Sequence, residues 1–279
     1  MSSLKIAVML PNLKMDPYDG LKAIAEMGVP GVHLSATRAF SPDNLDAVGR
    51  RKLAEHIRSL GLEISAISAW GGQVDLCEAE KAEENVAHGK ALMDLSVDLE
   101  APIWQAHIGI MPRKTADPRW QIVLDAAGEI AEYGEKVGAC LAIETGPEPP
   151  VVVKRLIETI RSPALRVNYD PANLILWPAG FAQRSGTPYN KEEALRDFQP
   201  VDGVTVLGPY IVHTHAKDAR VWEDGKRQEV PLGEGWVDWP RYVGLLREIG
   251  YDGYFAIERE TGEDPVADIR RAIEFLRTL

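Results

Sequence analysis

The sequence predicts a single (β/α)8 barrel that spans residues 1–279. Short apolar segments alternate with longer amphipathic segments along the whole chain, which is typical of βαβ units and a parallel sheet. Eight strand-like segments, each followed by a further segment, favour a closed barrel over an open doubly wound sheet. No Gly-x-Gly-x-x-Gly motif follows the first strand, which weighs against a dinucleotide-binding fold.

The predicted strands are short apolar runs rich in β-forming residues. We expect them at 5–10, 31–36, 62–69, 102–109, 140–145, 165–170, 210–216 and 254–259. The amphipathic stretches between them predict helices at 18–27, 45–60, 79–99, 120–137, 150–160, 239–249 and 265–279. Several helices pass to the next strand through a glycine, such as Gly61 or Gly138, because glycine adopts the left-handed conformation that ends a helix.

One segment between strand and helix is unusually long. Residues 174–206 contain several prolines and glycines, with a helical pattern only at 191–198. We therefore expect a long βα loop insertion here. Long βα loops often form lids or substrate walls, and a purely structural flap fits the same pattern.

The composition excludes several classes of partner. The net charge of −11 and pI near 5.1 disfavour nucleic acid and anionic membranes, since phosphate binding needs clustered Lys and Arg.

Cys77 and Cys140 lie far apart without redox or metal spacing. No run approaches the ~20 apolar residues of a membrane span, and the first apolar run is too short for a signal peptide. We expect a cytoplasmic protein.

Four predicted strands end on a side chain that can bind a metal. These side chains are Glu144, Asp170, His215 and Glu258. The carboxyl ends of parallel strands meet at one mouth of a barrel, where active sites lie. Three oxygen donors and one nitrogen donor suit Mn²⁺, Mg²⁺, Co²⁺ or Zn²⁺.

Strand parity supports this grouping, because residues two apart in a strand share one face. The residues two before the four candidates are small or polar: Ala142, Asn168, His213 and Ala256. Their immediate neighbours are mostly bulky and apolar, as expected for the face that packs on helices. Four inward polar groups at one depth would repel or stay unsatisfied without a cation.

The motifs around these residues resemble one known family. They are Ala-Ile-Glu144-Thr-Gly, Asn-Tyr-Asp170-Pro-Ala-Asn173-Leu, His213-Thr-His215-Ala-Lys217-Asp218, Ala-Ile-Glu258-Arg-Glu260 and Pro231-Leu-Gly-Glu-Gly235. Over essentially the whole chain, the sequence is similar to the xylose isomerase-like TIM barrel family of sugar phosphate isomerases and epimerases. Members include ketose 3-epimerases and 2-keto-myo-inositol isomerases.

The resemblance implies a metal-dependent isomerase or epimerase of a keto-sugar or keto-polyol. It implies that the four candidates hold one divalent ion, with Mn²⁺ the expected metal, and that Glu144 and Glu258 also move protons. The chemistry agrees, because proton removal beside a carbonyl gives an enediolate that a divalent ion stabilises while two carboxylates act as base and acid.

Further residues are candidates for contact with a small carbohydrate substrate. They are His33, Trp70, His107, Asn173, Lys217 and Arg220. Asn173 stands where similar ketose epimerases often carry histidine, and His33 stands where many relatives carry glutamate. Each of the six also fits a structural role. The resemblance leaves room for a homo-oligomer, since barrels of this family often pair.

Three alternatives stay open. A lyase or hydratase that cleaves a 3-keto-glycoside by β-elimination would use the same parts, and the departures at Asn173 and His33 keep it in view. A DNA endonuclease of the same fold family would need more histidines and a basic groove. A non-catalytic sugar-binding protein would be indicated by loss of a catalytic carboxylate, and neither glutamate is missing.

Overall fold

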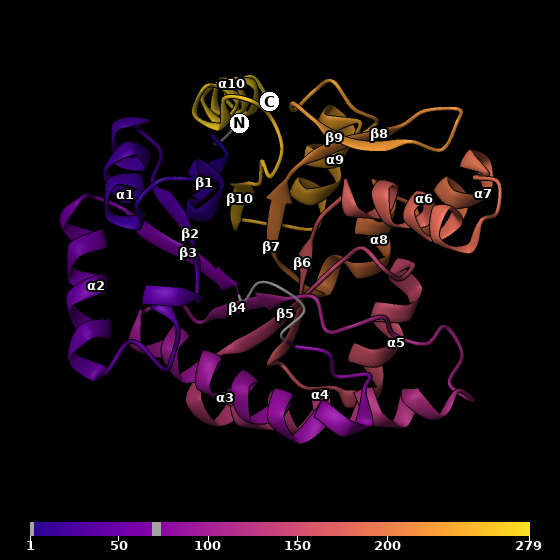
Figure 1. Ribbon diagram of the computed structural model, residues 1–279, viewed down its shortest axis with the longest axis horizontal. Coiled ribbons are helices and arrows are strands. Elements are labelled where there is room, and N and C mark those ends of the chain that lie inside the picture. Colours follow the sequence, from indigo (N-terminus) through magenta and orange to yellow (C-terminus); the bar gives the residue numbers. More distant parts are fainter. Residues whose placement is uncertain (1–2, 69–73) are drawn as a thin grey trace.

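Parallel strands form a closed barrel in the computed structural model, which describes residues 3–68 and 74–279 (Figure 1). The barrel strands are β1 (Lys5–Met9), β2 (Gly31–Ser35), β3 (Glu63–Ser68), β4 (Ile103–Ala106), β5 (Cys140–Glu144), β6 (Leu165–Tyr169), β7 (Ile211–Ala216) and β10 (Tyr254–Ile257). Around the barrel the order is β1-β10-β7-β6-β5-β4-β3-β2. The predicted fold class and all eight predicted strands are confirmed.

Six of these strands end one to three residues before the predicted end, and the predicted end of β3 at residue 69 lies outside the described residues. The largest difference is at β4, which stops at Ala106 rather than at residue 109. The reason is a change of bonding partner, because the carbonyl of Ile108 accepts from the N–H of Leu76 in the preceding mouth loop at 3.0 Å. The segment after β4 thus belongs to the mouth of the barrel.

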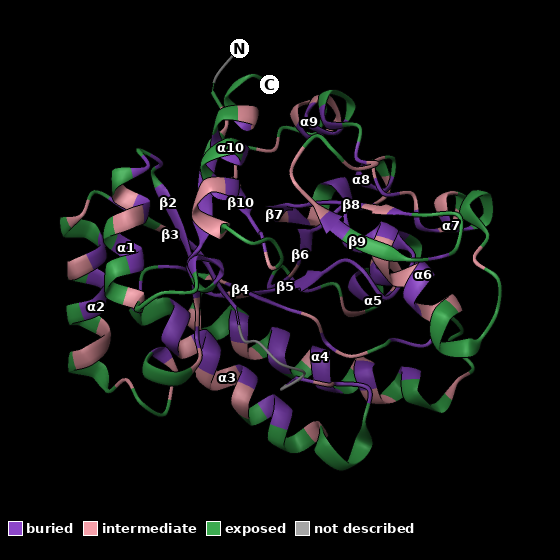
Figure 2. Cartoon of the chain, turned by 45° about the horizontal axis from the view of Figure 1, so that its top comes forward, coloured by how far each residue is buried: buried purple, intermediate pink, exposed green. Residues whose placement is uncertain are grey.

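Helices surround the barrel, and their outer sides are exposed while the strands are buried (Figure 2). They are α1 (Pro17–Glu26), α2 (Ala47–Ser59), α3 (Ala82–Asp98), α4 (Pro118–Val137), α5 (Pro150–Ile160), α6 (Asn173–Ser185), α7 (Lys191–Phe198), α8 (Gly203–Leu207), α9 (Trp239–Glu248) and α10 (Pro265–Arg277). Aspartate–proline pairs start three of them, at Asp16, Asp117 and Asp264, where the carboxylate accepts from a first-turn N–H. In the described part of the chain, no helix is both long and apolar enough to cross a membrane.

The apolar core lies mainly between the strands and the helices. It joins residues from most of the described strands and helices, including Val8 of β1 and Ile130 of α4. A small separate cluster of Ala7, Met9 and Ala256 lies inside the barrel. The strand faces that form this interior are otherwise small or polar, so polar side chains have room at the mouth.

Residues 174–206 are largely helical, which corrects the prediction of a long loop. The predicted helix at 191–198 is confirmed as α7, but α6 occupies most of the segment before it. Pro178 and Gly180 suggested a loop, yet both lie inside α6. Gly180 leaves space for the guanidinium of Arg227, which a Cβ at this position would displace.

A two-stranded antiparallel sheet follows β7, and the sequence patterns did not predict it. It consists of β8 (Asp218–Val221) and β9 (Arg227–Val230). Figure 1 shows this hairpin beside α6, and the close approach of Arg227 to Gly180 joins the two. The hairpin therefore forms one wall above the mouth.

Asp218 anchors the segment that leads from the hairpin to α9. Its carboxylate accepts from the backbone N–H groups of Gly233 at 3.0 Å and Gly235 at 3.1 Å, and from the indole of Trp239 at 3.0 Å. A Cβ at Gly235 would collide with this carboxylate. The Pro231–Gly235 motif is thus a backbone cradle for one buried acid.

Another buried carboxyl group lies in the loop after β5. Glu148 is 2% exposed, and its Oε1 accepts from the N–H of Met111 at 2.6 Å. Burial raises the pKa of Glu148 to about 8, although this hydrogen bond and the charge of Arg113 oppose the shift. Glu148 therefore keeps its proton in the folded protein under conditions in which an exposed glutamate is ionised.

Glu148 should make the stability of this protein depend on pH. Its pKa is higher in the folded chain than the ordinary 4.5, so the unfolded chain loses the proton first as pH rises. This contribution to the free energy of unfolding is complete below about pH 4.5 and disappears as pH approaches 8. Glu148→Gln removes it, so denaturant titrations should show the variant gaining stability relative to the native chain from pH 5 to 8. A constant difference across that range would contradict the account.

Candidate active site

Four ligand-type side chains meet at the mouth of the barrel, each from a different strand. Glu144 ends β5, Asp170 follows β6, His215 lies in β7 and Glu258 follows β10. One donor atom from each lies within 4.8 Å of the other three, and all four residues are buried. These strands are neighbours in the order β10-β7-β6-β5, so the two glutamates stand at the outer ends of the arc.

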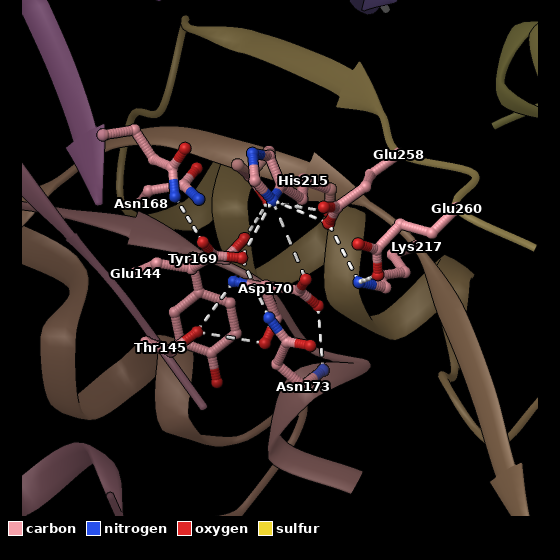
Figure 3. A network of polar contacts seen from close by, with 12 residues as sticks. Glu144, Thr145, Asn168, Tyr169, Asp170, Asn173, His215, Lys217, Glu258 and Glu260 are labelled. Carbon is pink, nitrogen blue, oxygen red and sulfur yellow. Dashed lines mark hydrogen bonds and ion pairs between the residues drawn. The ribbon is translucent and has the colours of Figure 1, made fainter. Parts of the chain in front are cut away.

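The distances within this cluster fit a divalent cation. Nδ1 of His215 lies 3.0 Å from Oε2 of Glu258, 3.1 Å from Oε1 of Glu144 and 3.7 Å from Oδ2 of Asp170 (Figure 3). Adjacent ligands around an octahedral ion with bonds of about 2.1 Å are about 3.0 Å apart. One imidazole nitrogen facing three carboxylates therefore has the spacing of ligands that share an ion.

Two carboxylate oxygens of the cluster support the same interpretation. Oδ2 of Asp170 and Oε2 of Glu258 are buried and have no hydrogen bond of acceptable geometry to any described residue, although Oε2 of Glu258 has two cations within ion-pair distance. A buried carboxylate oxygen without a partner is costly. A cation between these oxygens and His215 would satisfy them, so the residues present fit a divalent ion.

Neighbouring side chains hold Glu144 in place. The amide of Asn173 donates to its Oε1 at 2.8 Å, and the amide of Gln105 donates to its Oε2. Nε2 of His107 lies 3.4 Å from the same Oε2. Each oxygen of Glu144 is thus oriented by one amide while the carboxylate still faces the cluster.

Asp170 is oriented by the start of α6 and by Thr145. The N–H of Asn173 donates to its Oδ1 at 2.9 Å, which uses the helix N-terminus to fix a negative group. The N–H of Asp170 donates to the hydroxyl of Thr145 at 2.7 Å, and that hydroxyl donates back to the carbonyl of Asp170 at 3.0 Å. These bonds leave Oδ2 free to face the cluster.

A buried lysine lies on the outer side of Glu258. Nζ of Lys217 lies 3.2 Å from Oε2 of Glu258 and 2.7 Å from Oε2 of Glu260, and its side chain is 4% exposed (Figure 3). Lys217 shares the strand parity of His215, which explains why both face the mouth. The site therefore contains a fixed positive charge beside one of its two glutamates.

Burial and neighbouring charges shift the pKa values of the four side chains in the cluster. Burial favours the neutral forms, but nearby positive charges outweigh it: His107 and His215 lower the pKa of Glu144, and Lys217 and His215 lower the pKa of Glu258. Burial raises the pKa of Asp170. Burial opposes protonation of His215, but the carboxylates of Glu258 and Glu144 outweigh it and raise its pKa well above the ordinary value. A bound cation would replace the proton on Nδ1.

A cavity of about 470 Å³ opens over the cluster. Glu144, His215 and Glu258 line it together with Lys217 and with Trp177 of α6. A volume of this order accommodates a ligand larger than a single small sugar. The cavity thus has charged side chains at its base and a side wall formed by α6, the helix after β6.

Trp177 is the largest side chain that lines this cavity in the described part of the chain. Its ring packs against His107 with centroids 5.9 Å apart. Its indole also lies over the backbone of Gly146, where a Cβ would come within 2.7 Å of the ring. Glycine two residues after Glu144 therefore allows an aromatic wall to stand beside that carboxylate.

The structure brings most of the predicted site residues together. His107, Asn173 and Lys217 line the cavity with three of the four ligand candidates. Arg220 does not line it, and its guanidinium donates to the carbonyl of Glu234 instead. His33 is fully buried inside the barrel beneath the cavity. Trp70 lies outside the described residues.

Several lining residues were missed by the sequence patterns. Gln105 precedes His107 by two residues and so shares its strand face, a signal that parity could have given. Trp177 and Arg227 gave no comparable signal, because α6 and the hairpin bring them to the mouth only through tertiary packing. Glu260, which the sequence analysis named only as part of the motif after Glu258, lines the cavity as the partner of Lys217.

Curated proteins match this chain over part of its length. It is 24% identical over 189 residues to the uncharacterized protein MJ1311 of Methanocaldococcus jannaschii, covering 64% of this chain and 58% of that protein. It is 39% identical over 70 residues to L-ribulose-5-phosphate 3-epimerase UlaE of Escherichia coli, covering 24% of each. Both matches span less than two thirds of the relative.

Solved structures share the barrel over nearly its full extent. The xylose isomerase domain protein from Planctomyces limnophilus matches with a TM-score of 0.80 and 24% identity, covering 99% of this chain and 96% of that chain. The probable 3-DHS dehydratase AsbF from Bacillus anthracis gives 0.74 and 18%, covering 98% of each. A xylose isomerase-like TIM barrel protein from Mycobacterium smegmatis in complex with magnesium gives 0.75 and 18%, covering 100% and 98%.

These likenesses show the fold, and one comparison shows the family. The family model described as xylose isomerase-like TIM barrel matches residues 21–279, which includes all four ligand candidates and the hairpin above them. The barrel, its mouth and this match agree: the chain belongs to the xylose isomerase-like TIM barrel family.

Proposed function

We propose that this protein is a divalent-metal-dependent isomerase or epimerase of a keto-sugar or keto-polyol. One observation carries the proposal: Glu144 and Glu258 stand at opposite ends of the arc of four ligand candidates, with His215 and Asp170 between them. A small substrate held over the arc would present a different side to each glutamate. The partial match to L-ribulose-5-phosphate 3-epimerase supports the same reaction class.

The two glutamates would divide the proton transfer. The low pKa of each, set by its cationic neighbours against the effect of burial, keeps both carboxylates able to accept a proton at neutral pH. One glutamate, as the carboxylate, removes the proton beside the carbonyl; the other, after taking up a proton from solvent, returns that proton from the opposite side, and the first then releases its proton to solvent. Return to the same carbon inverts it, whereas return to the neighbouring carbon interconverts aldose and ketose.

The remaining residues of the site would hold the metal ion and orient the substrate and Glu144. A divalent ion, when bound by the four ligands, supplies positive charge that stabilises the oxygen anion formed as the carbon is deprotonated. Lys217 is placed to donate a hydrogen bond to a substrate oxygen while Glu258 and Glu260 hold its ammonium. Asn173 and Gln105 keep Glu144 aimed at the substrate.

A lyase acting on a 3-keto-glycoside is the second candidate. Loss of the same proton can expel a neighbouring substituent instead of relocating the proton. The cavity volume of about 470 Å³ and the wall formed by Trp177 favour it, because a glycoside is larger than a single sugar. The shared barrel of a probable dehydratase is compatible with elimination chemistry on this fold.

A substrate screen in D₂O separates these reactions. Keto-sugars, keto-inositols and 3-keto-glycosides are incubated with the Mn²⁺-loaded protein and followed by NMR. Deuterium at the carbon beside the carbonyl, with an isomeric product and no fragment, supports the isomerase or epimerase. Release of an aglycone supports the lyase, and no deuterium uptake from any of these compounds would reject both.

Glu144→Gln and Glu258→Gln should each lower kcat by about 10²–10⁴, the usual contribution of a general acid or base. Glu148→Gln provides a matched control, because Glu148 is also a buried glutamate at this end of the barrel but lies outside the ligand cluster. Steady-state kinetics with the substrate found in the screen measures the effect. Near-native kcat in either cluster variant would refute the proton-transfer assignment.

Removal of divalent ions should destabilise the protein. A ligand that binds only the folded chain adds about 2.7 kcal/mol when present at a hundred times its Kd. Dialysis against EDTA should therefore lower Tm, and added Mn²⁺ should restore it. Asp170→Ala should abolish the response, and a Tm unaffected by both treatments would argue against a metal site.

Trp177→Ala should raise KM by about tenfold, which corresponds to about 1.4 kcal/mol of lost contact. Trp222→Ala serves as the control, because this tryptophan of the hairpin turn is 38% exposed and does not line the cavity. Equal effects of the two changes on KM would contradict a role for Trp177 as a substrate wall.

A further inference from the structure

One nitrogen of the histidine in the ligand cluster has no partner. Nδ1 of His215 faces the three carboxylates, while Nε2 is buried without a hydrogen bond in the described part of the chain. A histidine that binds a metal through one nitrogen almost always donates from the other, which fixes its tautomer and ring orientation. His215 is 1% exposed, so bulk water does not supply that acceptor.

His33 is a neighbouring side chain with unused hydrogen-bonding capacity. It lies in β2 inside the barrel, is fully buried, and both of its ring nitrogens lack a partner in the described residues. Its ring centroid is 5.3 Å from that of His215, with the planes inclined by 48°. A neutral imidazole has one nitrogen that accepts.

His213 is close to both rings, yet it cannot fill this role. Its Nδ1 lies 2.8 Å from Oδ1 of Asn168, and its Nε2 lies 3.2 Å from the hydroxyl of Ser65. Both nitrogens are therefore occupied. The three histidines do not form a set of free ligands for a second ion, and His33 and His215 remain as the pair with unused nitrogens.

The rings are close enough for one water to bridge them. Ring nitrogens of His33, His213 and His215 lie within 4.8 Å of one another. Two hydrogen bonds of about 2.9 Å that meet at a tetrahedral oxygen span about 4.7 Å. A water held there would accept from Nε2 of His215 and donate to His33, and buried waters with two or more such bonds are regular parts of protein interiors.

We propose that His33 is a positioning residue for the metal site. The Nε2–H of His215 donates a hydrogen bond to a buried water, and that water donates one to His33, which keeps the lone pair of Nδ1 directed at the ion. This inference rests on the proposed function, because it assumes that His215 is a metal ligand. It also assigns a role to a histidine that does not reach the substrate cavity.

Metal affinity tests the proposal without an activity assay. Isothermal titration of the metal-free protein with Mn²⁺ gives Kd for the native chain, His33→Leu and His33→Gln. Loss of the acceptor in His33→Leu should raise Kd by about 10–100-fold. The amide oxygen of His33→Gln can accept, so its Kd should stay within about threefold of the native value. His88→Leu makes the same change on α3 and should leave Kd unchanged.

The outcomes separate the two claims. No Mn²⁺ binding by the native chain would remove the basis of the proposed function. Native binding with an equal Kd in His33→Leu would overturn the role of His33 alone, as would equal losses in the leucine and glutamine variants. Should His33→Leu fail to fold, His33→Met replaces it in the comparison with His33→Gln, since methionine fills the space without accepting the hydrogen bond.

Discussion

The structure depends on one electrostatic constraint, the meeting of three carboxylates and an imidazole in a buried mouth. Donor atoms of Glu144, Asp170, His215 and Glu258 within 4.8 Å of one another would be strongly destabilising as bare charges. A divalent ion bound among them would turn this repulsion into attraction. The surrounding amides, helix terminus and lysine all act on these four side chains, so the cluster organises the mouth.

The closed barrel is what brings the four together. Their strands are consecutive around the barrel although they are separated by long helical connections in the chain. Because each ligand comes from a different strand, the cluster forms only when these four strands pair side by side. The segment after β7 helps to shape the mouth. Asp218 is the first residue of the hairpin strand β8, and its carboxylate binds the indole of Trp239 at the start of α9.

Residue patterns predicted the barrel and its ligand cluster because both follow local rules. Strand parity and strand ends placed Glu144, Asp170, His215 and Glu258 together, and the structure has them together. The same rules failed where contacts between segments distant in the sequence determine the structure. The helical nature of α6 was hidden by Pro178, and Trp177 reaches the mouth only because Gly146 leaves space for its ring.

The central claim is that a single divalent ion binds between these four side chains. Anomalous diffraction from crystals grown with Mn²⁺ tests it most directly, because it locates the ion and its ligands independently of turnover. The account predicts one strong peak with Glu144, Asp170, His215 and Glu258 as protein ligands at about 2.0–2.3 Å. A peak held by His33 and His213 instead, or no peak at the mouth, would contradict it.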